Sequence, residues 1–306
     1  MSPLYHDRSA DAAMMAMDTL PASTTPPRGA APGFRPTATL PIRVELSRQL
    51  RRRRTQLTLA FMVLLPAILA LAFQLGSSSA GPSTSSFIDL ARSSAANFVM
   101  VTMFFSASFL LIVVISLYFG DTIASEASWS SLKYLLAMPV PRMRLLRQKL
   151  IVAAILSAVC IVVLAAVAAG IGLVLYGAHP LTTPTGETFT GSSALWRILL
   201  VIGYIAVQLA WVAGLATLMT VSTDVPLGAV GTAVLLSIVS QILDQITALG
   251  GFRGFLPTHY SFAWTGALVE PINWADMTRG TFSSVAYAFV LTVAAFLLFR
   301  RKDVTS

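Results

Sequence analysis

The sequence contains few charged residues and a single cysteine. Only 11% of its 306 residues are Asp, Glu, Lys or Arg, whereas a soluble globular domain has about 25%. The mean hydropathy is +0.75. These values exclude an ordinary soluble domain and predict an all-α integral membrane protein. Cys160 cannot form a disulfide within the chain, and its place in an apolar run is typical of a small packing residue.

Motifs for nucleotide binding, metal binding and hydrolysis are also absent. The sequence has no GxxxxGK[ST], HExxH or GxSxG pattern, and its three histidines, His6, His179 and His259, are isolated from one another. We therefore expect no catalysis, cofactor or metal in this chain. The net charge of +8 does not indicate a nucleic-acid partner, because the basic residues lie beside apolar runs, where anionic lipid attracts them.

Residues 1–40 are rich in Pro, Ala, Ser and Thr, which predicts a disordered tail. From 41 to 56 the pattern changes to that of an interfacial amphipathic helix. Ile42, Leu46 and Leu50 are spaced by four residues among arginines that include the run Arg51–Arg54. The alternative is a basic stop signal that precedes the membrane.

Six apolar runs follow, each near the roughly twenty residues that cross a bilayer core. We place the spans at about 57–75, 98–119, 150–175, 196–221, 225–246 and 281–299. The third and fourth are longer than required and must tilt or project. No span has a charge at its centre, and we expect no broken helix at mid-membrane, so an ion-coupled carrier is poorly supported.

The distribution of Lys and Arg predicts the orientation. With both termini and the loop between spans two and three in the cytoplasm, that side holds 17 of the 21 basic residues, and the others are Arg92, Arg197, Arg253 and Arg279. The positive-inside rule favours this topology, since the reverse would move the Arg51–Arg54 run across the membrane.

The three external segments differ in composition. Segments 76–97 and 176–195 are rich in Ser, Thr, Gly and Pro and are predicted to be flexible loops. Segment 247–280 contains many aromatic residues, which favour the membrane–water boundary. We expect short re-entrant helices there, with a simple aromatic belt as the alternative.

A polar, basic segment from Asp121 to Lys149 joins the second and third spans. Helical spacing places an apolar stripe on one face, made of Trp129, Leu132, Leu135 and Leu136, while Glu126, Ser130 and Lys133 lie on other faces. Pro139 and Pro141 then end the helix. From these residues alone, the stripe either lies on lipid or enters a groove on a partner.

The order of residues in this segment resembles the loop after the second span of type 2 ABC transporter permeases. The matching residues are Glu126, Ser130-Ser131-Leu132-Lys133-Tyr134-Leu135-Leu136, Pro139-Val140, Arg142 and Lys149. That family usually has Gly-Thr where this chain has Ser130-Ser131. The ending Phe299-Arg300-Arg301-Lys302-Asp303-Val304 is also similar. The resemblance covers about residues 45–306.

The resemblance implies a six-span permease domain over 57–306 in the plasma membrane, with both termini cytoplasmic. It further implies a coupling helix that docks on a separate ATPase subunit, where ATP and Mg²⁺ bind, and pairing with a second permease copy or a paralogue. The implied coupling residues are Glu126, Trp129, Leu132, Lys133, Leu135, Leu136 and Arg142. The expected function is export of a hydrophobic or amphipathic substrate. The alternative is a membrane scaffold, immunity or sensor component that transports nothing.

Three polar residues in or near the spans are candidates for a translocation path or for contacts between helices. Gln208 lies within the fourth run, and an unsatisfied amide there is costly. Gln241 and Asp244 are one turn apart near the predicted outer end of the fifth run, where we expect Asp244 at interfacial depth.

The topology predicts which side of the membrane each loop faces. In a Cys160→Ser background, single cysteines at Ser78, Thr185 and Thr258 should react with an impermeant maleimide in intact cells. Cysteines at Ser131 and Ser306 should react only after lysis. Labelling at Ser306 in intact cells would contradict the orientation.

Overall fold

The computed structural model describes residues 42–75, 82–128 and 142–301, so the predicted tail over 1–40 lies outside the described residues. The described chain forms an all-α membrane protein. Six helices are long and apolar enough to cross a bilayer, at Arg53–Leu75, Ala95–Gly120, Met143–Tyr176, Gly191–Ser222, Pro226–Gln245 and Ala275–Arg301. These confirm the six predicted spans, and most extend several residues beyond the predicted ends.

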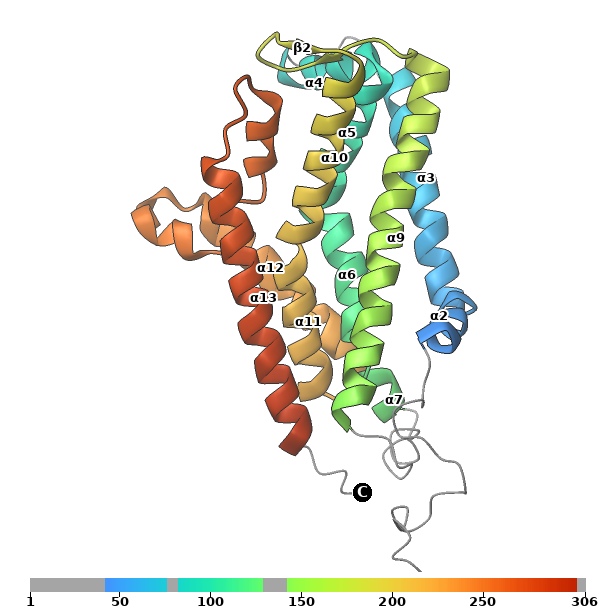
Figure 1. Cartoon of the computed structure of the whole chain (residues 1–306), viewed down its shortest axis with the longest axis vertical. Coiled ribbons are helices and arrows are strands. Elements are labelled where there is room, and N and C mark those ends of the chain that lie inside the picture. Colours follow the sequence, from blue (N-terminus) through green and yellow to red (C-terminus); the bar gives the residue numbers. More distant parts are fainter. Residues whose placement is uncertain (1–41, 76–81, 129–141, 302–306) are drawn as a thin grey trace, which may run out of the picture.

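Each span corresponds to one or more labelled elements (Figure 1). They are α3 (Arg53–Leu75), α5 (Ala95–Phe105) with η2 (Ser106–Leu110) and α6 (Leu111–Gly120), α9 (Arg142–Tyr176), α10 (Gly191–Gln208) with α11 (Ala210–Ser222), α12 (Pro226–Gln245) and α13 (Ala275–Arg301). The shorter elements are α2 (Ile42–Leu50), α4 (Pro82–Ser93), α7 (Ala124–Ser128), β1 (Leu181–Thr182), β2 (Thr188–Phe189), η3 (Thr247–Phe255) and η4 (Ala263–Leu268).

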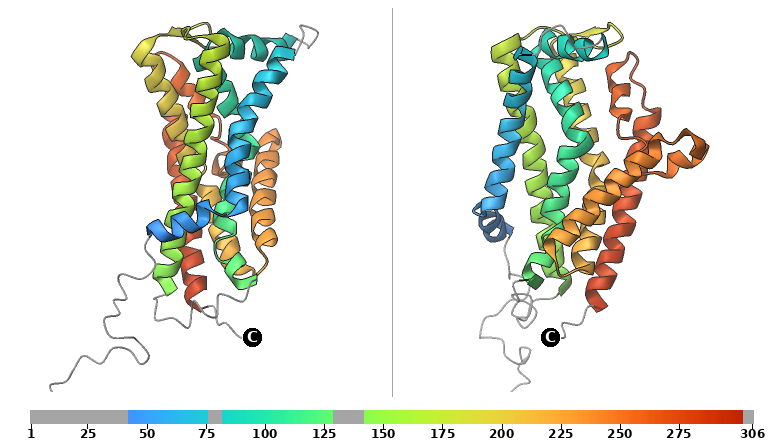
Figure 2. Two further views of the ribbon diagram at one scale, coloured as in Figure 1. Left: turned by 90° about the vertical axis from the view of Figure 1, so that its right-hand side faces the viewer. Right: turned by 180° about the vertical axis from the view of Figure 1, so that it is seen from behind.

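The long helices stand side by side, with α4 and the β1–β2 hairpin at one end and α2 and α7 at the other (Figures 1 and 2). Helix α9 packs against α3 and α5, and α11 packs against α6 and α13. The shared core includes the fully buried side chains of Phe98, Met103, Leu111, Leu164 and Val201.

The outer face of the bundle is apolar, as a lipid-facing surface must be. On α3 the exposed leucines Leu57, Leu64 and Leu71 recur every seven residues. Met62, Ala70 and other residues on the opposite face are buried. The helix therefore has one face for its neighbours and one that suits hydrocarbon.

Helix α2 is shorter than the predicted 41–56 segment. It ends at Leu50, and Arg53 already begins α3. It lies across the end of the bundle (Figure 2), where Glu45 and Gln49 are buried and Ile42, Val44 and Leu50 are exposed. The arginine run lies at the start of the first span, where Arg52 and Arg54 reach the carboxylate of Asp121.

Both segments predicted as flexible external loops contain regular structure. Residues 82–93 of the first form α4. In the second, Leu181 pairs with Phe189 and Thr182 with Thr188 in an antiparallel hairpin. The side chain of Asn97 holds the hairpin, since it accepts from the Thr182 N–H (2.9 Å) and donates to the Thr182 carbonyl (2.6 Å). Composition alone missed this pairing.

Two spans are interrupted, which corrects the expectation of unbroken helices. Residues 106–110 of the second span form a π-helix, a local widening that often marks a functional site. The fourth span breaks at Leu209, between α10 and α11. There the Ser284 hydroxyl contacts the carbonyls of Val207 (2.9 Å) and Gln208 (2.8 Å) and lies 3.3 Å from the Trp211 N–H. A side chain of α13 thus compensates for the break.

Short helices are present in segment 247–280, as η3 and η4. Helix α12 is tilted and ends well below the hairpin end of the bundle, and the chain then rises through η4 to the start of α13 (Figure 2). Asp244 lies in the last turn of α12, at one end of the fifth span. Thr258 is buried and lies 2.8 Å from the Ser240 hydroxyl, so the exposed Glu270 is a better labelling position than Thr258.

A glycine allows the close contact between α11 and α13. A Cβ at Gly214 of α11 would lie 2.9 Å from the Ala288 Cα and 2.9 Å from its carbonyl oxygen in α13, whereas a Cβ at Gly203 of α10 would meet nothing within 4 Å. Gly214→Ala should therefore force the two helices apart and lower stability by about 1–3 kcal/mol. The melting midpoint of the purified protein should fall, and that of the matched Gly203→Ala variant should not. Equal midpoints would contradict this close packing.

Candidate functional site

The residues predicted to couple to a partner fall into three groups. Trp129, Leu132, Lys133, Leu135 and Leu136 lie outside the described residues. Arg142 is the first residue of α9. Glu126 lies in the first turn of α7, which ends at Ser128, before the predicted stripe begins.

Glu126 points into the bundle, and its side chain is only 8% exposed. Its Oε1 accepts from Lys149 Nζ in α9 (3.0 Å) and from Arg48 in α2 (3.0 Å). Lys149 is itself only 4% exposed. Because a buried carboxylate without a partner is strongly unfavourable, this contact holds α7 against α9 and α2.

Glu126 belongs to a larger group of charges, which we term the charge cluster. Three carboxylates and four cations meet at the end of the bundle that carries α2 and α7: Glu45, Asp121, Glu126, Arg48, Arg52, Arg54 and Lys149. Glu45 accepts from Arg48 (2.8 Å) and Gln49 (3.0 Å) and lies 3.7 Å from Lys149. Arg54 pairs with Asp121. The cluster thereby joins α2, the start of α3, the end of α6, α7 and α9.

The surroundings of the cluster favour the ionised form of Glu45 and disfavour that of Arg52. Burial raises the pKa of Glu45, but hydrogen bonds from Arg48 and Gln49 and the charge of Lys149 outweigh it and hold that pKa below its usual range. Its stabilising contribution is therefore complete at neutral pH and disappears only when the pH falls through this lowered pKa. Burial and the nearby charge of Arg48 lower the pKa of Arg52.

A second contact fixes the start of the segment that follows α6. The Thr220 hydroxyl of α11 accepts from the N–H groups of Ile123 (3.1 Å) and Ala124 (3.0 Å). Ile123 precedes α7 and Ala124 is its first residue, and both residues are buried. Thr220 therefore acts as the cap that this short helix lacks in its own sequence.

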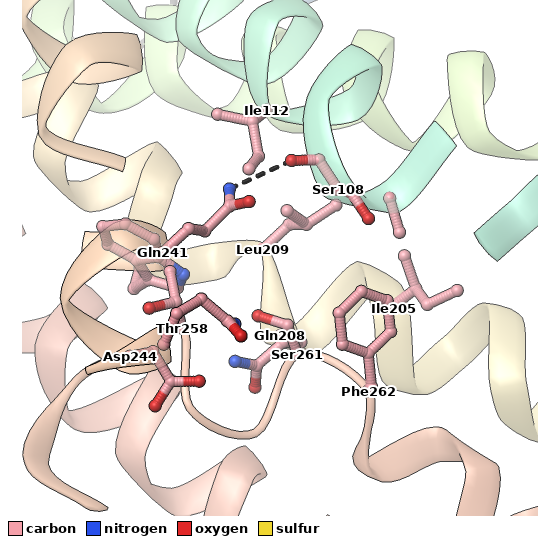
Figure 3. A pocket seen from close by; sticks show the side chains of 13 residues that line it. Ser108, Ile112, Ile205, Gln208, Leu209, Gln241, Asp244, Thr258, Ser261 and Phe262 are labelled. Atoms are coloured by element: carbon pink, nitrogen blue, oxygen red, sulfur yellow. Dashed lines mark hydrogen bonds between the residues drawn. The ribbon is translucent and has the colours of Figure 1, made fainter. Parts of the chain in front are cut away.

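The three candidates for a polar path, Gln208, Gln241 and Asp244, line one cavity of about 70 Å³, which we term the polar cavity (Figure 3). Its wall is built from η2, α6, α10, α11, α12 and the chain after η3. Other polar side chains around it are Ser108, Gln245, Thr258 and Ser261. The meeting of Gln208 with Gln241 and Asp244 was not predicted, because Gln208 lies on the fourth span and the other two on the fifth.

Each of the three side chains has a partner. Gln241 Nε2 donates to the Ser108 carbonyl of the π-helix (3.0 Å; Figure 3), and Gln208 Nε2 donates to the Pro257 carbonyl (2.7 Å). Asp244 Oδ1 lies 2.6 Å from His259 Nδ1 and 3.5 Å from Arg253 Nε. These contacts hold the segment after η3 against α10 and α12 and satisfy an otherwise unpaired backbone carbonyl.

His259 and Arg253 were not predicted as partners of Asp244. Arg253 follows Asp244 by nine residues, and His259 follows Asp244 by fifteen. The chain changes direction between Asp244 and these two residues, so no spacing rule connects them. The density of aromatic residues in 247–280 indicated that the segment is ordered. It did not indicate which residues the segment contacts.

The charge cluster can be tested against an exposed ion pair. Lys149→Met leaves Glu126 and Glu45 with one buried partner fewer, so stability should fall by about 3–5 kcal/mol. The control is Arg279→Met, since Arg279 and Asp276 are 69% and 60% exposed at 3.7 Å, and such a pair contributes at most about 1 kcal/mol. Thermal unfolding of the two purified variants measures the difference. Similar losses in both would show that the cluster does not stabilise the fold.

Comparison with known proteins gives a family and no activity. No curated protein matches the sequence. A family model described as "Protein of unknown function (DUF2705)" matches residues 58–305, from the first turns of α3 to the end of the chain. The match includes the polar cavity and the six spans apart from the first five residues of α3. It contains three of the seven residues of the charge cluster, Asp121, Glu126 and Lys149, and excludes α2. Because it extends over most of the sequence, the chain belongs to the DUF2705 family.

Proposed function

We propose that this protein is the membrane-spanning subunit of an ATP-driven exporter and that segment 121–149 docks on a separate ATPase. The proposal is supported by the resemblance of this segment to the coupling loop of type 2 ABC permeases and by the six apolar helices. In this proposal both termini face the cytoplasm, α2 lies in the membrane interface, and two permease subunits pair in the plasma membrane.

The observation that carries the proposal is the attachment of this segment to three spans. The segment continues directly from α6 and into α9. Glu126 is bound to Lys149 of α9, and Thr220 of α11 holds the backbone at Ile123 and Ala124. When a partner displaces the segment, α6, α9 and α11 therefore move with it.

The role of Glu126 follows from these contacts. Its carboxylate faces the bundle and not the outside, so it acts as the link between the docking segment and the spans. The apolar stripe of Trp129, Leu132, Leu135 and Leu136 supplies the contact with the ATPase, as a helix in a groove. The two functions, docking and transmission, are thus divided between neighbouring parts of one segment.

Substitutions separate docking from transmission. Leu132→Asp should reduce the ATPase that copurifies with the tagged protein at least tenfold, because a carboxylate would be desolvated in the groove. Ser130→Asp, on another face of the same predicted helix, is the matched control and should retain the ATPase. Glu126→Gln should retain it as well but lose substrate-stimulated ATP hydrolysis and export, because the charge that binds Lys149 and Arg48 is gone.

Two results would overturn the proposal. Normal copurification and normal export by Leu132→Asp would mean that the stripe faces lipid. Recovery of the wild-type protein from native membranes without any ATPase would favour the non-transporting scaffold, immunity or sensor component.

A further inference from the structure

The polar cavity contains hydrogen-bond acceptors that the surrounding side chains leave unused. Gln241 and Gln208 each use their amide N–H₂ group to donate to a backbone carbonyl, of Ser108 and Pro257 respectively. Their Oε1 atoms remain. Gln241 Oε1 accepts no hydrogen bond within the described part of the chain, and Gln208 Oε1 has only a long contact of 3.5 Å with the Tyr204 hydroxyl.

Asp244 adds a third acceptor, which carries charge. Both of its ionic contacts, to His259 and Arg253, are made by Oδ1. Oδ2 accepts no hydrogen bond from the residues that the structure describes. The Arg253 Nε lies 3.5 Å from Oδ1, beyond the usual 2.7–3.2 Å of an N–H···O bond, so only the His259 contact, at 2.6 Å, has hydrogen-bond length and Oδ2 can accept from a ligand. Asp244 is nonetheless only 13% exposed, and water compensates it incompletely.

From these contacts we infer that the polar cavity binds a primary ammonium group. Such a group has three N–H donors and one positive charge, which match the oxygens of Asp244, Gln241 and Gln208. A quaternary ammonium has the charge without the donors, and a neutral hydroxyl has one donor without the charge. Neither satisfies three acceptors of which one is a carboxylate oxygen.

The size and the apolar part of the cavity define the rest of the ligand. A volume of about 70 Å³ accommodates a small head group or a few waters and excludes a drug-sized molecule. The wall also contains Ile112, Ile205, Leu209 and Phe262. The ligand is therefore an amphiphile whose amine enters the cavity and whose tail remains among apolar helix surfaces. The claim that this amphiphile is the exported substrate rests on the proposed function. The claim that the cavity binds it is independent of that function.

A pair of amphiphiles tests the assignment on the full-length purified chain in phosphatidylcholine nanodiscs. Dodecylamine and dodecyltrimethylammonium have the same tail and charge, but only the first donates hydrogen bonds. Binding raises the melting midpoint in proportion to saturation, so the midpoint as a function of ligand concentration gives an apparent Kd for each. We expect dodecylamine to bind at least tenfold more tightly than its trimethyl analogue.

Variants connect this selectivity to the cavity. Asp244→Asn should remove most of the tenfold preference, and Asp276→Asn, which alters an exposed carboxylate of α13, should retain it. Because Asp244→Asn also disturbs His259 and Arg253 and can affect folding, Ser261→Leu provides a second variant. The Ser261 hydroxyl makes no hydrogen bond in the described part of the chain, so a leucine fills the cavity without removing a contact.

A primary ammonium can come from a transported amphiphile or from an aminophospholipid. If phosphatidylethanolamine is the source, nanodiscs of that lipid should stabilise the wild type and not Ser261→Leu, and added dodecylamine should then have little further effect. If a transported amphiphile is the source, the two lipids should give equal midpoints, and dodecylamine should stabilise the protein in both.

Equal apparent Kd values for the two amphiphiles in the wild type would overturn the assignment. So would an unchanged preference in Ser261→Leu. The measurement uses the isolated chain, so it is independent of the ATPase. Failure of ATPase copurification would refute the proposed function and leave the binding result intact. Loss of amine selectivity would refute the ligand assignment and leave the proposed function intact.

Discussion

A bilayer contains no water to satisfy backbone amides and carbonyls, and most of this structure follows from that constraint. Continuous helices satisfy it internally, but the second span widens into a π-helix and the fourth breaks at Leu209. Each interruption exposes backbone groups, and each has a polar side chain from another span beside it: Gln241 at Ser108 and Ser284 at the Leu209 break. Gln241 and Ser284 thus lie where they can bond the backbone groups that an interruption in a neighbouring span exposes.

The same constraint decides how much could be predicted from the sequence. Runs of some twenty apolar residues have few other structures available to them, so the six spans were predictable, with ends that vary by a few residues. The breaks were not predictable, because the backbone at Leu209 is satisfied by Ser284, a hydroxyl 75 residues further along the chain. Hairpin β1–β2 escaped prediction for a similar reason: Asn97, outside the loop, makes the contacts that order it.

The charge cluster shows how the same reasoning applies to charges at the end of the bundle. The arginines in and after α2 suggested attraction to anionic lipid, and a stretch of basic residues is typical of that role. Arg48, Arg52 and Arg54 in fact have carboxylate partners from other elements, including Glu126 and Asp121. The resemblance to a coupling loop implied a role for Glu126 within segment 121–149. It did not predict that the carboxylate faces the bundle, because its partner Arg48 is 78 residues away in the sequence.

Polar groups that only stabilise a membrane protein and polar groups that bind a ligand can be distinguished by whether their hydrogen bonds are complete. In the charge cluster, acids and bases meet at short distances, and Glu126 Oε1 alone has contacts to three cations. In the polar cavity, Gln241 donates to a carbonyl of the π-helix and Gln208 to a carbonyl of the chain after η3. Each of these bonds uses only the donor of an amide, so the acceptor of the same amide remains in a cavity that Asp244 also lines. A side chain that satisfies a backbone carbonyl within the bundle thereby leaves an acceptor there, and on these acceptors we base the assignment of an ammonium ligand.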